Sequence, residues 1–162
     1  MLNRVALEAR VAELAHQAAT TGGQVAMIIA DIDHFKSVND DHGHGVGDAV
    51  LRDVAYRLRS DLRAFESAYR IGGEEFVILL AGTDASTAAM VAERLRHAVR
   101  DEPAAGVDVT MSFGVAAILP GDAFEYSEIF RRADTVLYEA KANGRDQVMV
   151  DGPGAERILQ AA

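Results

Sequence analysis

Apolar side chains recur every three or four positions in several long stretches of this chain. That spacing places them on one face of a helix and leaves the polar side chains on the other. The helices predicted in this way cover residues 2–19, 48–62, 127–142 and a stretch that ends near Arg100, with a short helical turn after Lys36. Asp84 or Ser86 is expected to cap the stretch that ends near Arg100, because both side chains accept hydrogen bonds from amides at a helix start.

Between the helices lie continuous apolar runs of strand length. Residues 24–30 predict one buried strand, and further strands are expected at residues 107–119 and 145–150. Residues 68–81 contain two runs that meet at Gly72-Gly73, and glycine accepts the positive φ angles of a tight turn, so this segment predicts a β-hairpin. Strands and helices that alternate without an internal repeat or linker predict an α/β fold, one sheet with helices packed on its faces.

Composition narrows the class of protein. With 162 residues, 49% of them hydrophobic, the chain suits one domain with a buried core, and the absence of cysteine excludes disulfides and thiolate metal sites. No apolar run approaches the roughly 20 residues of a membrane span, so we expect a cytoplasmic chain that makes no membrane contact, although a longer protein containing it could be membrane-attached. The formal charge of −9 argues against a polynucleotide partner but leaves a single nucleotide possible.

Two acidic sites follow the predicted strands. The first strand runs into Asp31-Ile32-Asp33, where alternation points both carboxylates the same way, and the hairpin turn is followed at once by Glu74 and Glu75. If the hairpin lies beside the first strand, Asp31 and a glutamate converge into the all-oxygen environment that Mg²⁺ or Mn²⁺ prefers. Acidic residues also collect at exposed strand ends, so each pair alone fits either interpretation, and the two pairs together favour a catalytic site.

Several segments resemble the GGDEF family of diguanylate cyclases. The segments are Asp31-Ile32-Asp33-His34-Phe35-Lys36-Ser37-Val38-Asn39-Asp40, Gly43-His44-Gly45-Val46-Gly47-Asp48, Gly72-Gly73-Glu74-Glu75-Phe76, residues 110–116 and residues 133–145. The resemblance runs from about residue 2 to about residue 150, so we expect one catalytic domain over residues 1–150 and a tail over residues 151–162. It implies a palm-like fold with a central, mostly antiparallel sheet flanked by helices.

The resemblance also implies a reaction. Members condense two GTP into cyclic di-GMP and two pyrophosphates, and each 3′-hydroxyl attacks the other nucleotide's α-phosphate across two facing domains, so the chain is expected to act as a homodimer. Two Mg²⁺ or Mn²⁺ ions per site would be held by Asp31, the main-chain carbonyl of Ile32, Glu74 and, less directly, Glu75. Glu74 would also accept the hydroxyl proton, and Lys36 would stabilise charge on the phosphates.

Further residues match the family's substrate contacts. The expected contacts are the Phe35 and Lys36 amides, Gly72, Gly73, Lys141 and Arg145 for the phosphates, Asn39 and Asp48 for guanine, and His44 in the same pocket. Without the family, Lys36 would be taken as a solvated lysine and Lys141 as a cation attracted to a helix C-terminus. Asp33, Asp40 and Asp41 are expected to be structural or solvated acids, and Ser112 and Gly114 to serve packing.

The chain departs from the family in two places. Many members carry an inhibitory Arg-x-x-Asp site that binds the product, and here the matching segment is Arg63-Ala64-Phe65-Glu66, with Arg94 as the secondary arginine. Glu66 is one methylene longer than the expected aspartate, so we predict weakened product inhibition. The family's opening Asp-x-Leu-Thr-Gly-Leu-x-Asn-Arg run is entered only at Leu2-Asn3-Arg4, which predicts a domain truncated at its front edge and controlled by an upstream segment.

Two alternatives to an active cyclase stay open. A non-catalytic receptor domain that binds GTP or cyclic di-GMP would share the fold, but such a domain is expected to lose the hairpin acids, and Glu74 and Glu75 are both present. A polymerase-like or mononucleotide cyclase palm would share the metal acids without the Gly72 to Phe76 hairpin motif.

Overall fold

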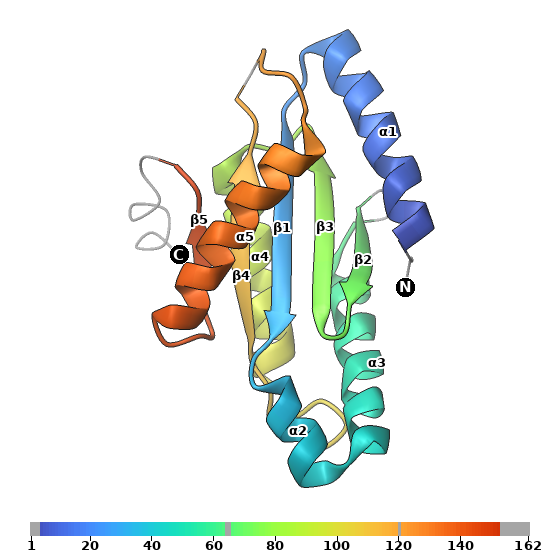
Figure 1. The fold of residues 1–162 in the computed structure, drawn as a ribbon, viewed down its shortest axis with the longest axis vertical. Coiled ribbons are helices and arrows are strands. Elements are labelled where there is room, and N and C mark those ends of the chain that lie inside the picture. The colour runs from blue at the N-terminus through green and yellow to red at the C-terminus, as the bar shows by residue number, and fades with distance from the viewer. Residues whose placement is uncertain (1–3, 64–65, 120, 153–162) are drawn as a thin grey trace.

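The structure, a computed structural model, describes residues 4–63, 66–119 and 121–152 (Figure 1). The elements in chain order are α1 (Arg4–Thr21), β1 (Val25–Ile32), α2 (Phe35–His42), α3 (His44–Asp61), β2 (Ser67–Gly72), β3 (Glu75–Ala81), α4 (Ala85–Arg100), β4 (Met111–Ala117), α5 (Tyr126–Ala142) and β5 (Val148–Val150). The expectation for residues 155–162, a frayed or weakly helical end, lies outside the described residues.

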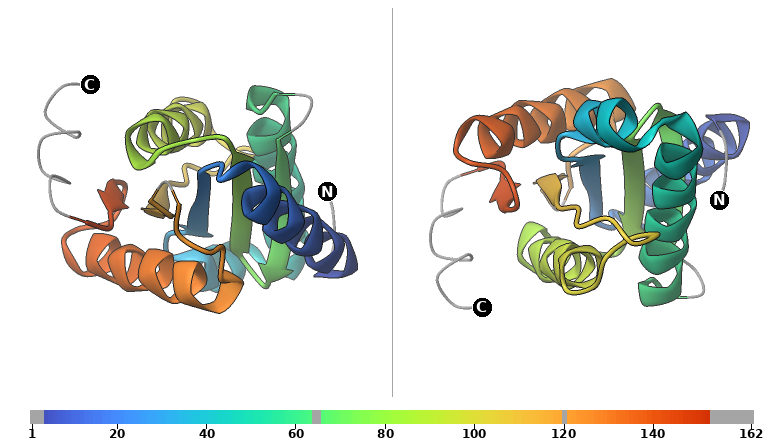
Figure 2. Two further views of the ribbon diagram at one scale, coloured as in Figure 1. Left: turned by 90° about the horizontal axis from the view of Figure 1, so that it is seen from above. Right: turned by 90° about the horizontal axis from the view of Figure 1, so that it is seen from below.

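The strands form one five-stranded sheet in the order β2-β3-β1-β4-β5. The pairs β2/β3, β3/β1 and β1/β4 are antiparallel, and only β5 runs parallel to its neighbour β4. Seen end-on, α4 and α5 cover opposite faces of the sheet (Figure 2). The expected α/β fold, a mostly antiparallel sheet flanked by helices, is confirmed.

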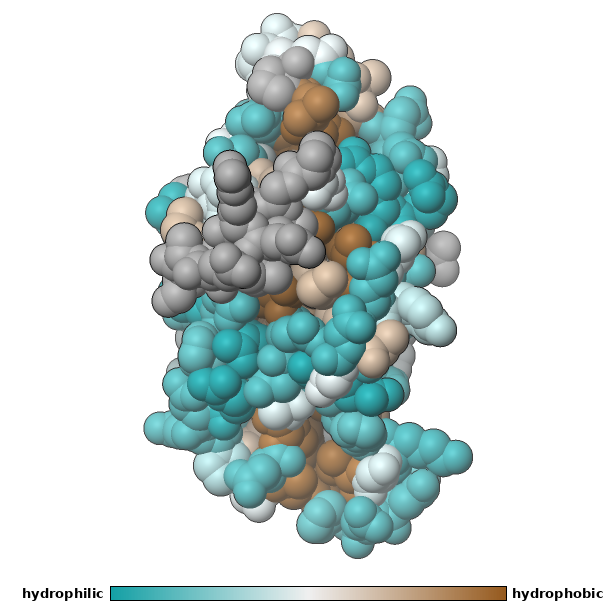
Figure 3. All heavy atoms as spheres, turned by 90° about the vertical axis from the view of Figure 1, so that its left-hand side faces the viewer, coloured by the Kyte–Doolittle hydropathy of each residue, from teal (hydrophilic) through white to brown (hydrophobic). Residues whose placement is uncertain are grey.

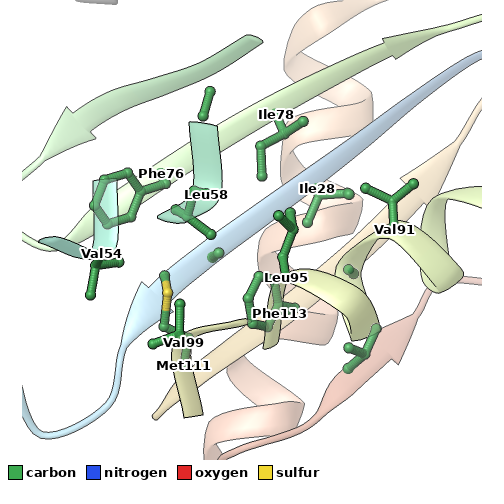
Figure 4. Packing of buried hydrophobic residues seen from close by; sticks show 14 of the residues in the cluster. Ile28, Val54, Leu58, Phe76, Ile78, Val91, Leu95, Val99, Met111 and Phe113 are labelled. Atoms are coloured by element: carbon green, nitrogen blue, oxygen red, sulfur yellow. The ribbon is translucent and has the colours of Figure 1, made fainter. Parts of the chain in front are cut away.

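The core lies on both sides of β1. Every residue of β1 is buried, so its alternating side chains enter two different hydrophobic clusters. Ile28 packs among side chains from α3 and α4, as Figure 4 shows with Leu58 and Leu95, whereas Met27 packs on the face covered by α1 and α5. A strand buried on both faces explains why its sequence is a continuous apolar run rather than an alternating one.

Gly114 on β4 brings α5 against the sheet. A side-chain carbon at this glycine would lie 2.1 Å from the carbonyl oxygen of Ala133 and 2.6 Å from the amide nitrogen of Leu137, both on α5. Only glycine allows the helix backbone this close, which confirms the expected packing role of Gly114. Because α5 ends beside the tip of β1, this contact also fixes the position of the residues at its C-terminal end.

The start of α3 and the strand predicted at residues 107–119 differ from the structure. Residues 44–47, which precede the helix predicted at residues 48–62, already belong to α3: Gly43, with a φ of 81°, makes the corner after α2 and the helix starts at His44. The strand predicted at residues 107–119 is shorter, because residues 101–110 form turns and an isolated bridge before β4. The cap of α4 is Asp84, whose Oδ1 accepts from the Thr87 amide at 2.7 Å.

The face beside β5 is mostly hydrophilic, with small hydrophobic areas between the polar side chains (Figure 3). Within the described ranges, no helix is both long enough and apolar enough to cross a bilayer.

Candidate active site

Three parts of the fold meet at the lower end of the sheet in Figure 1: the end of β1, the turn between β2 and β3, and the C-terminal end of α5. Asp31, next to last in β1, pairs in register with Glu75 on β3 and with Ser112 on β4. The Ile32 amide donates to the Glu74 carbonyl at 3.4 Å, which ties the hairpin turn to β1. The sheet register therefore brings the two acidic segments of the sequence together.

Asp31 is the buried acid of this group. Its exposed fraction is 8%, and one oxygen, Oδ2, lies 2.9 Å from Nζ of Lys141, which reaches it from the end of α5. Burial raises the pKa of Asp31, the Lys141 ammonium opposes that rise, and the nearby Glu74 and Glu75 carboxylates add to it. Three carboxylates thus create a negative potential that a cation at Asp31 relieves.

The other acids are more open. Glu74 is half-buried in the turn and Glu75 is exposed at the start of β3. Across the described part of the chain, no three histidine, aspartate or glutamate side chains already lie in a metal-binding arrangement. Asp31, Ile32, Glu74 and Glu75 are close in the fold, and their role as metal ligands stays a prediction.

Two of the cations expected at the phosphates follow one another at the end of α5. Lys141 is half-buried against Asp31, and Arg145 is exposed in the turn that follows the helix. The Arg145 amide donates to the Ala140 carbonyl at 3.0 Å, which closes the helix end. The two cationic residues are therefore held on one rigid segment.

Lys36 and Phe35 lie in the first turn of α2. Lys36 is exposed and Phe35 is buried, and the residue before the helix, His34, has a left-handed backbone with a φ of 55°. The first amides of a helix have no partner within it, so those of Phe35 and Lys36 suit an anion, and their contact with phosphate stays a prediction.

The residues expected to read guanine lie on α2, which carries Asn39, and on α3, which carries Asp48. Asn39 packs against Gly47, because a side-chain carbon added to Gly47 would lie 2.0 Å from Oδ1 of Asn39. Asp48 is exposed and lines a hollow of about 430 Å³ along α3, and His44 is the exposed first residue of that helix. Gly72 ends β2 and pairs with Glu75, so the hairpin turn itself is Gly73-Glu74, and neither glycine has the positive φ that the sequence led us to expect. Gly73 is exposed, and its carbonyl accepts from Nε of Arg70 at 2.7 Å.

Sequence reasoning missed several residues around this end of the sheet. Arg52, Arg59 and Arg70 line the same hollow as Asp48, but scattered arginines give no sequence signal. Asp33, expected to be structural or solvated, is buried and has hydrogen-bonded partners on other segments, so the structural alternative holds. Ser112, expected only to pack, is one of those partners.

The segment matched to the inhibitory site is organised differently. Glu66 is buried at 6% exposure, and its Oε2 accepts from the backbone amide of Arg63 at 2.9 Å. The Arg63 side chain is exposed, and Ala64 and Phe65 lie outside the described residues. Arg94 on α4 is paired with Asp61, its Nε 2.7 Å from Oδ2 and its Nη2 2.8 Å from the main-chain oxygen.

Comparisons with known proteins agree with this geometry. Among solved structures, the active GGEEF domain of a diguanylate cyclase from Vibrio cholerae is 33% identical with a TM-score of 0.87, covering 94% of this chain and 98% of that one. The GGDEF domain of DgcB from Caulobacter crescentus, solved in complex with c-di-GMP, is 32% identical with a TM-score of 0.83, covering 91% of this chain and 90% of that one.

Curated relatives point the same way. The diguanylate cyclase DgcP of Pseudomonas aeruginosa is 40% identical over 91% of this chain, and the response regulator PleD of Caulobacter vibrioides is 39% identical over 91%. The matches span only 22% and 34% of those two proteins. The family model for the diguanylate cyclase GGDEF domain matches residues 1–147, so the chain belongs to the GGDEF family of diguanylate cyclase domains.

Proposed function

We propose that this chain is a diguanylate cyclase that condenses two GTP into cyclic di-GMP and two pyrophosphates. The observation that carries the proposal is the contact between Asp31 and Lys141 at the end of β1, with Glu74 and Glu75 beside it. A buried carboxylate next to further acids suits a metal ion, and a lysine on the same spot suits phosphate.

The residues present fit a divalent metal. Asp31 carries a carboxylate whose pKa is raised by burial and by two neighbouring glutamates, and the ammonium of Lys141 takes the place of a cation at 2.9 Å. Asp31, the Ile32 carbonyl and Glu74 would hold Mg²⁺ or Mn²⁺, with Glu75 as a further oxygen ligand. When bound, two such ions neutralise charge on the transferring phosphate and lower the pKa of the attacking hydroxyl.

The chain's own side chains divide the remaining work. In each half of the reaction, the 3′-oxygen of one GTP bonds to the α-phosphorus of the other, and the bond from that phosphorus to the bridging oxygen breaks, releasing pyrophosphate. Glu74, half-buried at the turn, accepts the hydroxyl proton. Lys36, Lys141 and Arg145 bind the charged oxygens, and the amides at the start of α2 add donors.

Guanine would lie between α2 and α3. Asp48 is exposed at the mouth of its hollow, where a carboxylate accepts from the ring N1–H and the exocyclic amine of guanine, and the Asn39 amide both donates and accepts. Adenine lacks this donor pattern, so we expect GTP to be preferred to ATP. His44, at the first position of α3, lies in the same region.

The reaction requires a second copy of the chain. One domain presents one set of acids and one set of phosphate cations, whereas cyclic di-GMP has two phosphodiester bonds formed by two reciprocal attacks. Two domains related by a two-fold axis, each with one GTP, satisfy this requirement. A non-catalytic receptor would bind the same nucleotides without forming either bond.

The direct test is to incubate the purified chain with GTP and Mg²⁺ and separate the products by chromatography. The proposal predicts cyclic di-GMP and two pyrophosphates for each product formed, with ATP giving no cyclic product. GTP binding without product would instead identify a receptor domain, and neither binding nor product would contradict both.

A further inference from the structure

Asp33, two residues beyond Asp31, is a buried carboxylate for which the proposed chemistry has no use. Its exposed fraction is 5%, and it accepts three hydrogen bonds: from Oγ1 of Thr110 at 2.7 Å, from Oγ of Ser112 at 2.7 Å and from the backbone amide of Asp146 at 3.1 Å. No basic side chain within the described ranges pairs with it. An ionised carboxylate only accepts hydrogen bonds, so Asp33 links the segment of Thr110 and Ser112 to the segment of Asp146.

The segment that needs such a tie is the turn of residues 144–146. Gly144, Arg145 and Asp146 have φ angles of 112°, 64° and 44°, so two consecutive residues with side chains adopt the left-handed region. Isolated chains avoid this conformation, and it persists only where surrounding contacts hold it. The turn carries Arg145 and follows directly after the helix that carries Lys141.

Asp146 is held from two sides. Its amide donates to Oδ2 of Asp33, while its carbonyl and its Oδ1 accept from Nη1 of Arg96 on α4, at 3.2 and 2.8 Å. The Arg96 guanidinium is largely buried and is itself held by Glu93. The backbone of the turn is therefore fixed between the end of β1 and α4.

We propose that Asp33 is a positioning residue for the terminal phosphates of the substrate, acting through the 144–146 turn to hold Arg145 in place beside Lys141. The role rests on the proposed function, because it assumes that Arg145 binds the β- and γ-phosphates of GTP. One short strand end then serves both halves of the substrate's triphosphate: Asp31 at the reacting phosphate and Asp33, through the turn, at the leaving pyrophosphate.

The test compares two ligands that differ in the terminal phosphates. Calorimetry with Mg²⁺ measures binding of GMP and of a GTP analogue whose α–β bridge is a methylene group, which cannot be cleaved. Asp33→Ala should weaken the triphosphate analogue about tenfold, the loss of one charge-assisted contact, and leave GMP within about twofold. Asp33→Asn should restore the affinity, because its amide oxygen accepts from Thr110 and Asp146 while its NH₂ donates to Ser112.

A double-mutant cycle separates positioning from general damage. If Asp33 acts through Arg145, then Asp33→Ala combined with Arg145→Ala binds the analogue no more weakly than Arg145→Ala alone. Arg96→Gln removes the two hydrogen bonds from Arg96 to Asp146 without touching β1, leaves the 3.7 Å ion pair between Arg100 and Asp146 in place, and should show a selective loss of the same kind. Leu14→Ala, fully buried in α1 and far from the turn, is the control for destabilisation alone.

Equal losses for GMP and the analogue, or additive losses with Arg145→Ala, would overturn the positioning role even if the wild type binds GTP well. Failure of the wild type to bind either ligand would overturn the proposed function and this role with it.

Discussion

The lower end of the sheet and the segment from Arg63 to Glu66 hold their charged groups in opposite ways. At the sheet end, Asp31 and Lys141 come from separate elements and meet across the fold. At the second segment, Glu66 bonds to the backbone amide of Arg63, three positions before it, and Arg94 on α4 is paired with Asp61 at the end of α3. The pair at the sheet end has two further carboxylates beside it, Glu74 and Glu75, so several groups face one place, whereas Glu66 and Arg94 bond to separate partners. We therefore predict an active reaction site and a weakened product site.

Loss of the Glu74 carboxylate at the hairpin turn should have the largest effect on the rate of the reaction. Glu74→Gln removes the proposed proton acceptor and one metal ligand from a half-buried position, so cyclic di-GMP formation should fall by about 10³-fold. The melting temperature should stay near that of the wild type, because no core contact is lost. Asp40→Asn, an exposed acid on α2, is the matched control and should turn over normally. Wild-type turnover by Glu74→Gln would remove Glu74 from the mechanism.

Removal of the α5 cation should have the next largest effect. Lys141→Ala deletes the ammonium at Asp31 and the proposed phosphate contact, so KM for GTP should rise about tenfold. Arg131→Ala removes another cation from the same helix, one that pairs with Glu128 on the exposed side. Steady-state kinetics on both variants tests the assignment: equal changes in KM would show that α5 acts through its overall charge.

In the segment matched to the inhibitory site, substitutions should strengthen a function, namely inhibition by cyclic di-GMP. Glu66→Asp restores the shorter side chain of the family's inhibitory site, and Asp61→Ala removes the carboxylate that accepts from Nε of Arg94. Each should lower the concentration of cyclic di-GMP that halves the rate by about threefold. For Arg94 the effect is small because its exposed ion pair with Asp61 is worth little. Product titrations of the initial rate measure this. Tight stoichiometric product binding by the wild type, lost in Arg63→Ala, would contradict the weakened site.

The pH dependence of the melting temperature should show how much the buried carboxylate of Asp31 costs in stability. The pKa of Asp31 is raised above the ordinary value of 3.8, chiefly by burial, so the folded protein holds this proton more tightly than the unfolded chain does. The free energy of unfolding therefore falls as the pH rises from 3.8 to the pKa of Asp31 in the folded protein. Without metal, Asp31→Asn should therefore raise the melting temperature at pH 7 by about 2 °C and lose that advantage near pH 3. A lower melting temperature at pH 7 would show that the Lys141 pair outweighs the burial cost.

The sequence predicted what depends on periodicity and on local motifs. The apolar run before Asp31 and the glycines at the hairpin were enough to predict these strands and the antiparallel pairing of β2 with β3, which follows from a tight turn. The place of the hairpin beside β1 was only a condition in the sequence reasoning, and the pairing of β1 with β3 meets it. The start of α3 was predicted wrongly, since Gly45 and Gly47 suggested a loop. In the structure, tertiary packing of Asn39 against Gly47 outweighs the low helix propensity of glycine.

Contacts between distant segments could not be predicted. Asp33 meets Asp146 across 113 positions, and Arg96 meets the same residue across 50. No periodicity or local spacing encodes such pairs, so Asp33 looked like one more acid near a strand end. The hydrogen bond from the Arg63 amide to Glu66 could not be predicted either, because the length of the Glu66 side chain does not by itself indicate which group it contacts.

The central claim is that two copies of this chain together make cyclic di-GMP from GTP. The most direct measurement is the rate of product formation per chain, with saturating GTP and Mg²⁺, over a wide range of protein concentration. The account predicts a specific rate that rises with concentration and then levels off as the facing dimer forms. A constant specific rate in a chain shown by light scattering to be monomeric throughout would contradict it.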